Sequence, residues 1–286
     1  MAKLLLILLW VLLAIYLFVL LQDFREKNRE EKMERTGTLG IAATGFIVNF
    51  FDTLGIGSFA ITTSIFKQWK MVKDRIIPGT LNTAMCIPII AEALIFIDKV
   101  EVDPKTLISM IMAAVIGAFF GSGIVSKLDE KKVQLGMAVA LLSVFLLMLS
   151  GKLGILPIGG TATGLTGAKF FIAVLSNFIL GALMTLGIGL YAPCMALVLS
   201  LGMSPLVAFP IMMGSCAFLM PVAGIKFIKE GAYDARVTFI ITVFGVLGVL
   251  VAAYLVKSLP LSMLTWVVMV AILYTSVRLF IDSKNN

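Results

Sequence analysis

Long apolar stretches constrain the fold of this chain more than any other feature of its sequence. A helix needs about 20 apolar residues to cross a bilayer. Stretches of that length lie at 4–22, 76–97, 106–126, 133–150, 206–225, 237–256 and 261–280. Hydrophobic residues make up 60% of the chain and charged residues only 14%, whereas soluble domains carry about 25% charged residues. The sequence therefore predicts an all-α integral membrane protein.

Two longer apolar stretches, 38–66 and 169–200, are each interrupted near the middle by the same pentapeptide, Thr-Leu-Gly-Ile-Gly. An ungapped shift of 132 residues superimposes the two copies and makes eight of sixteen neighbouring positions identical. The same shift aligns Pro78 with Pro210. Repetition at a fixed shift indicates duplicated structural units. We therefore expect four segments: an anchor helix with a charged cytoplasmic linker (1–37), transmembrane repeat 1 (38–150), a Gly-rich linker (151–168) and transmembrane repeat 2 (169–286).

The loop charges favour a re-entrant helical hairpin at each interrupted stretch, because cytoplasmic loops of membrane proteins concentrate Lys and Arg. With hairpins, each repeat has three spanning helices, and the two repeats are inverted relative to one another, as in many secondary transporters. The N-terminus of this multi-pass cell-membrane protein then lies outside and its C-terminus in the cytoplasm. Of the 23 Lys and Arg residues, the outer side holds only Lys3, Lys99, Lys105, Lys152, Lys169 and Lys257. The alternative is a long tilted helix kinked at the glycines, which would place the basic loop 67–75 outside.

The paired glycines permit a turn with positive φ inside the membrane. A helix that restarts after such a turn presents free N–H groups and the positive end of its dipole, which bind an anion without a buried Lys or Arg. Two breaks in inverted repeats would form one central site near the bilayer midplane. Glycine in membrane helices also serves close helix packing, and we expect that role for Gly117 and Gly121.

Small polar residues gather around the two interruptions and in the helix that follows each. Hydroxyl and amide donors at matching depth suit an oxyanion. About half of these side chains are expected to bond only the carbonyl four residues earlier in their own helix. The predicted substrate-binding residues are Asn49, Thr53, Gly55, Gly57, Ser58, Thr80, Asn82, Thr83, Asn177, Gly187, Gly189, Tyr191, Cys194, Ser215 and Cys216.

Two carboxylates, Asp52 and Glu92, lie deep in apolar sequence. Ionisable residues inside membranes are costly and usually functional, so we predict a proton-coupling role for both. A sodium ligand is one alternative. Asp52 could instead cap a half-helix or pair with a loop lysine.

Several function classes are excluded or disfavoured. The chain has no His and no Gly-x-x-x-x-Gly-Lys-Ser/Thr motif, so it lacks an imidazole base, a His-containing metal site and an ATPase of its own. The three cysteines lie in apolar stretches, which argues against a disulfide framework. The net charge of +7 comes from loop residues and does not indicate nucleic-acid binding. We expect no enzymatic activity, no cofactor and no metal.

The doubled Leu-Gly-Ile-Gly break, followed each time by a helix with a proline near its start and small polar residues, resembles the sulfite exporter TauE/SafE family, also called the toluene sulfonate uptake permease family. The resemblance covers about 38–282. It implies transport of sulfur-containing anions such as sulfite, sulfoacetate and other organosulfonates, by export in some members and import in others. The family's first break is usually Gly-Ile-Gly-Gly-Gly, whereas this chain reads Gly-Ile-Gly-Ser-Phe at 55–59 and Gly-Ile-Gly-Leu-Tyr at 187–191.

The sequence thus predicts a secondary transporter of a small sulfur-containing anion, sulfite or an organosulfonate, that works by alternating access in the lipid bilayer and is coupled to protons. Two alternatives stay open: an anion channel of the same fold, and a transporter of another small anion. The sequence does not define the exact substrate, its direction, the oligomeric state or the role of the anchor helix.

Overall fold

The computed structural model describes residues 2–29, 37–55, 57–96, 101–155, 159–255 and 261–285. Apart from one isolated bridge between Ala162 and Met203, the regular elements in these ranges are helices. In chain order they are α1 (Ala2–Arg29), α2 (Thr38–Thr53), α3 (Phe59–Gln68), the 3₁₀ helix η1 (Asp74–Ile76), α4 (Ile77–Ala84), α5 (Cys86–Phe96), α6 (Pro104–Val125), α7 (Glu130–Lys152), α8 (Gly167–Met184), α9 (Tyr191–Ser200), α10 (Pro205–Lys229), α11 (Ala235–Leu255) and α12 (Leu261–Asn285).

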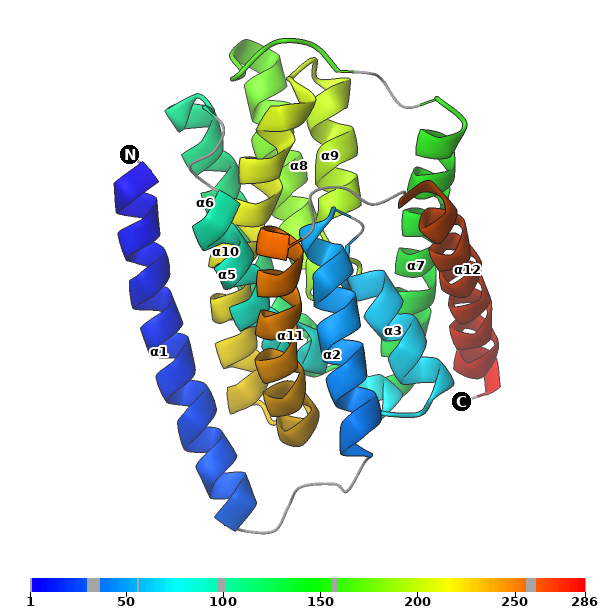
Figure 1. Ribbon diagram of the computed structural model, residues 1–286. Coiled ribbons are helices and arrows are strands. Elements are labelled where there is room, and N and C mark those ends of the chain that lie inside the picture. The colour runs from blue at the N-terminus through cyan, green and yellow to red at the C-terminus, as the bar shows by residue number, and fades with distance from the viewer. Residues whose placement is uncertain are drawn as a thin grey trace.

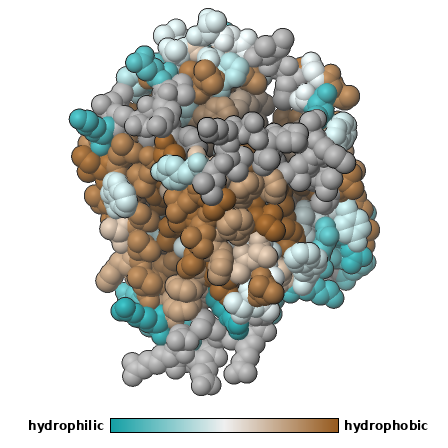
Figure 2. Space-filling model, in the orientation of Figure 1, coloured by the Kyte–Doolittle hydropathy of each residue, from teal (hydrophilic) through white to brown (hydrophobic). Residues whose placement is uncertain are grey.

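Seven of the described helical segments are long and apolar enough to cross a membrane. Six of them coincide with predicted spans, and the seventh is α8. The predicted span 261–280 falls within α12, where part of the side chains lie outside the described set. Figure 2 shows a broad hydrophobic band across the middle of one face, with hydrophilic residues above and below it. The chain is therefore a multi-pass helical membrane protein.

The closest helix pairs join the first half of the chain to the second. Helix α2 packs along α11, and α6 packs along α8. Small residues allow this approach: a Cβ on Gly117 would lie 1.9 Å from the carbonyl oxygen of Phe178, and one on Gly121 would lie 2.6 Å from that of Ala182. The packing role expected of these two glycines is confirmed.

The two interrupted stretches form pairs of short helices. Between α2 and α3, Gly55 and Gly57 both have φ +90°, and between α8 and α9, Gly187 and Gly189 have φ +94° and +77°. Each pair doubles back on itself, α2–α3 in the lower part of Figure 1 and α8–α9 in the upper part. We call the two glycine-containing turns the first and the second chain reversal.

The ends of the returning helices also match. After α3, the N–H of Met71 donates to the carbonyl of Phe66 while Lys70 has φ +51°. After α9, the N–H of Met203 donates to Val198 while Gly202 has φ +87°. Both are helix ends closed through a left-handed residue, 132 positions apart.

Helix α1 packs on the bundle, against α10, α5 and α11. The buried hydroxyl of Tyr16 donates to the carbonyl of Thr83 at 2.7 Å, beside Gly224, where a Cβ would come within 2.8 Å of the Tyr16 ring. At the far end of α1, the hydroxyl of Tyr233 donates to Asp23. Burial raises the pKa of Tyr233, and the bond to Asp23 raises it further, so this phenol stays neutral and remains a donor.

Helices α7 and α12 pack mainly on one another. Their further contacts are chiefly with α3, η1 and α9, and Figure 1 shows the pair at one side of the molecule. This α7–α12 pair forms one wall of the candidate site.

Candidate functional site: a cavity between the two chain reversals

The two chain reversals meet at one cavity. Gly57 and Ser58 of the first reversal line it, and so do Ile188 and Gly189 of the second. The cavity holds about 450 Å³ of space between atoms, part of it open to the surroundings. The direct approach of the two reversals is tight, since a Cβ on Gly189 would lie 3.1 Å from that of Phe59. Segments 132 residues apart thus share one site.

The first turns of both returning helices face the cavity. Phe59, Ala60 and Ile61 of α3 and Tyr191 and Ala192 of α9 are among its lining residues. The first N–H groups of a helix have no partner within the helix and carry the positive end of its dipole. Two such ends at one cavity make an environment that favours an anion.

Most of the remaining wall is apolar. It includes Ile89 of α5, Met184 of α8, Val144 and Met148 of α7, and Ile272 of α12. Sequence reasoning missed these five residues, because in a helix that is apolar all round no periodic signal separates a cavity-lining side chain from one that faces lipid.

Asp52 provides the charge-bearing group of the cavity wall. It is buried, and the hydroxyl of Ser58 donates to its Oδ2 at 2.8 Å. Ser58 immediately precedes α3. Asp52, in the last turn of α2, therefore contacts the residue before the returning helix, and among the described ion pairs none joins it to a loop lysine.

Glu92 joins the two halves of the chain behind the cavity. Its Oε1 accepts from the hydroxyl of Thr53 at 2.9 Å, and its Oε2 accepts from that of Tyr191 at 2.9 Å. Glu92 is fully buried, and Tyr191 itself lines the cavity. One hydroxyl therefore links Glu92 to the cavity.

The predicted binding residues divide by position. Those that line the cavity are Gly57, Ser58, Gly189, Tyr191 and Cys216. The thiol of Cys216 lies 3.7 Å from the Sδ of Met184. Thr53 is connected to the lining residue Tyr191 by two hydrogen bonds through Glu92, and Gly187 lies beside Leu81 and Thr63. Gly55 and Cys194 are absent from the wall as described.

The three asparagines use their amide donors within the bundle. Asn49 donates to the carbonyl of Gly45 and to the Sδ of Met85. Asn177 donates to the carbonyl of Met110 and to Ser215. Asn82 donates to the carbonyl of Pro78 at 2.8 Å. Its side-chain nitrogen also lies 3.5 Å from the carbonyl oxygen of Thr185 in the second reversal.

The threonines of the helix after the first hairpin are likewise engaged elsewhere. Thr80 accepts from the N–H of Asp234, and Thr83 shares a 2.8 Å hydrogen bond with Thr238. Other polar residues of α3, namely Thr62, Thr63 and Ser64, bond the carbonyl four residues earlier. That expectation from sequence is confirmed for these three.

Comparison with known proteins gives one informative result. Neither the curated proteins nor the solved structures include a match. The family model described as sulfite exporter TauE/SafE matches residues 1–148. This region includes the anchor helix, which the resemblance seen in the sequence left out, and ends within α7. The matched region covers more than half of the chain, and the chain therefore belongs to the sulfite exporter TauE/SafE family.

Proposed function

We propose that this protein is a secondary transporter that carries a small sulfur-containing anion, sulfite or an organosulfonate, through the cavity between the two chain reversals. The family and the membrane-spanning helices support transport. The observation that carries the proposal is the meeting of two helix starts at one cavity whose described lining includes neither Lys nor Arg. Such a site holds an anion through backbone dipoles and hydroxyl donors, as transporters do near the bilayer midplane.

The two halves act as inverted repeats with re-entrant hairpins in this proposal. It is supported by the equal bounds of α3 and α9 after a shift of 132 residues, and by the positive φ of the glycines in both breaks. The hairpins also lie toward opposite ends of the molecule. A duplicated, inverted unit gives the protein two related ways to close around one site.

The proposed orientation puts the N-terminus outside and the C-terminus in the cytoplasm. In Figure 1, α1 ends in the lower part of the molecule, as do α3 and the chain's C-terminus. The loops expected on that side carry most of the Lys and Arg residues, in agreement with the positive-inside rule.

The makeup of the cavity wall supports alternating access. Val144, Met148 and Ile272 belong to the α7–α12 pair, whereas the helix starts belong to the hairpins. The pair makes few contacts outside the hairpin helices and η1, so a small movement between the pair and the rest opens the site to one side. Movements of one helix group against another are the usual basis of alternating access.

The position of Asp52 in the cavity wall supports proton coupling. An anion cannot share a low-dielectric cavity with an ionised carboxylate without a large electrostatic cost. A proton on Asp52, or on Glu92 with Tyr191 as the connecting hydroxyl, removes this cost. The anion and a proton are therefore expected to bind together.

A flux assay in proteoliposomes tests the proposal. Purified protein should give saturable movement of sulfite or an alkanesulfonate that responds to an imposed pH gradient. Ser58→Ala should reduce this flux. Ser64→Ala, at a buried serine of α3 whose hydroxyl donates to the carbonyl of Ala60, should not. Absence of flux for every sulfur oxyanion would contradict the proposal, and large unitary currents would indicate a channel instead.

A further inference from the structure

A second hollow lies at the end of α3 away from the central cavity. It is bounded by the segment 67–74 on one side and by Tyr274, Thr275 and Arg278 of α12 on the other. It contains about 1700 Å³ of space between atoms, much of it open to solvent. Its lining is polar, in contrast to the central cavity. We call it the α3–α12 groove.

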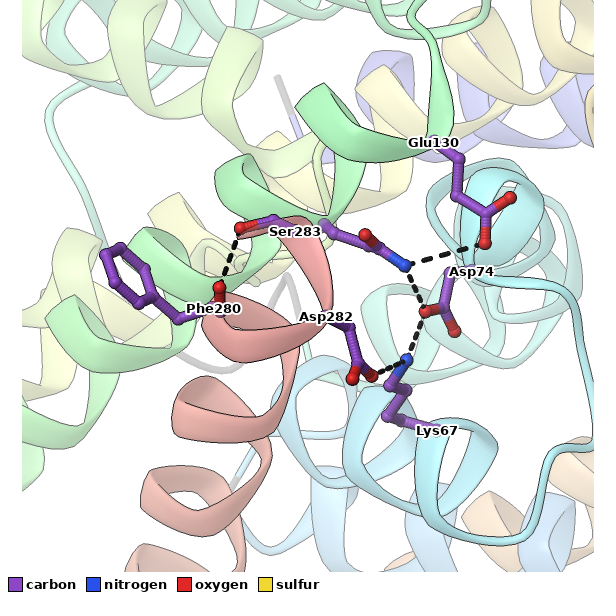
Figure 3. Close-up of polar contacts among 7 residues, drawn as sticks. Lys67, Asp74, Glu130, Phe280, Asp282 and Ser283 are labelled. Carbon is purple, nitrogen blue, oxygen red and sulfur yellow. Dashed lines mark hydrogen bonds and ion pairs between the residues drawn. The ribbon is translucent and has the colours of Figure 1, made fainter. Parts of the chain in front are cut away.

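The acidic residues of this groove already have partners. Figure 3 shows Lys67 between Asp74 and Asp282, with a distance of 2.7 Å to Asp282. Gln134 donates to Asp74 at 2.8 Å and to Glu130 at 3.5 Å. The carboxylates of the groove are thus already bound by Lys67 and Gln134.

Two cations of the groove are left over. Within the described residues, neither Lys70 nor Arg278 takes part in an ion pair, and both side chains are exposed. Lys70 also has a left-handed backbone, with φ +51°, where the matching residue of repeat 2 is Gly202. A non-glycine residue in this conformation costs about 1 kcal/mol, so Lys70 occupies a position for which glycine is the better residue.

Aromatic and apolar residues locate the groove at the edge of the membrane. Trp69 is 64% exposed and Tyr274 is 54% exposed, and both line it. Tyr and Trp concentrate at the level of lipid headgroups. One turn further into the membrane, Val270 of α12 is 68% exposed, as expected for a side chain that faces lipid tails.

We infer that the α3–α12 groove binds the headgroup of an anionic phospholipid, with its phosphate between Lys70 and Arg278 and its acyl chains along the exposed face of α12. Basic pockets between helices at the cytoplasmic surface are suited to such lipids. Arg278 can hold two phosphate oxygens at once, and Lys70 acts as a point charge. The bound lipid joins the loop after the first hairpin to the α7–α12 pair, beside the ion pairs of Lys67 with Asp74 and Asp282.

Binding can be measured by native mass spectrometry of the purified full chain with added dioleoylphosphatidylglycerol, with dioleoylphosphatidylcholine and inorganic phosphate as separate arms. The double variant Lys70→Gly and Arg278→Gln removes both cations, and glycine fits the left-handed position. The matched control, Lys131→Gln with Lys229→Gln, removes two exposed cations from the same side of the molecule. A size-exclusion profile and the melting temperature verify that each variant is folded.

The wild type and the control should bind phosphatidylglycerol equally, and phosphatidylcholine far more weakly. The double variant should bind phosphatidylglycerol more weakly by about five-fold for each cation removed, the equivalent of about 1 kcal/mol per charge. Equal binding by the folded double variant, or equal binding of the two lipids, would overturn the inference. Displacement of the lipid by inorganic phosphate at equal concentration would show a free-anion site and would also overturn it.

Discussion

The hydroxyl of Tyr191, the first residue of α9, donates a 2.9 Å hydrogen bond to the Oε2 of Glu92 in α5. This bond joins the second chain reversal to a buried carboxylate of the first half of the protein. Since Tyr191 also lines the central cavity, it connects that carboxylate to the space proposed for the anion. Variants of Glu92 and Tyr191 therefore test proton coupling directly.

We predict that Glu92→Gln abolishes the response of flux to a pH gradient, because glutamine cannot carry the proton. Tyr191→Phe should lower the proton-coupled flux about ten-fold, because it removes the hydroxyl that connects Glu92 to the cavity, a hydrogen bond worth about 1.5 kcal/mol. Proteoliposome flux with and without the pH gradient measures both effects. Glu101→Gln, at an exposed residue, serves as the control, and retained coupling in Glu92→Gln would exclude this carboxylate.

Gly57→Ala should lower both stability and flux. A Cβ at Gly57 meets no atom within 4 Å, so the cost comes from its φ of +90° alone, and should be about 1–2 kcal/mol. Gly37→Ala is the control, because its surroundings are equally open but its φ is −62°. Thermal unfolding in detergent measures the difference, and equal melting temperatures for the two variants would contradict the strained-turn account.

Gly117→Ala should destabilise the fold by about 1–3 kcal/mol, as overpacking usually does, because its new Cβ would meet the backbone of α8. Gly123→Ala in the same helix should be close to neutral, since there a Cβ meets only the flexible end of Lys226. Denaturation curves for both variants give the comparison. A destabilisation confined to Gly123→Ala would show that α6 and α8 do not approach as described.

Asp103 should make the stability depend on pH. The hydroxyl and the backbone N–H of Thr106 hold the pKa of Asp103 below its ordinary value of 3.8. A carboxylate with a lowered pKa contributes stability above that ordinary value, and the contribution is lost as the pH falls through the folded-state pKa. Asp103→Ala should therefore lower the melting temperature at pH 7, by a margin that shrinks below pH 4. Glu101→Ala should show no such margin, and a margin independent of pH would argue against the capping bond.

The membrane spans could be predicted because hydrocarbon selects for length and apolarity, and both can be read from the sequence. The chain reversals were likewise marked by glycine, because other residues rarely adopt positive φ. The contacts of Asn49 and Asn177 could not be foreseen, since an amide inside a membrane can donate to a carbonyl of its own bundle as readily as to a ligand. The packing of α1 through Tyr16 depends on the absence of a side chain at Gly224. This contact forms only once helices distant in sequence have packed.

Equilibrium binding of a radiolabelled alkanesulfonate to the purified protein tests the central anion site most directly. The account predicts saturable binding of one anion per chain. Ser58→Ala should weaken binding about ten-fold, roughly one hydrogen bond to a charged group, because a protonated Asp52 can donate to the Ser58 oxygen and leave the Ser58 hydroxyl to donate to the anion. Ser64→Ala should bind as the wild type does. Absence of saturable binding for sulfonate and sulfite alike, or equal affinities for the two variants, would contradict it.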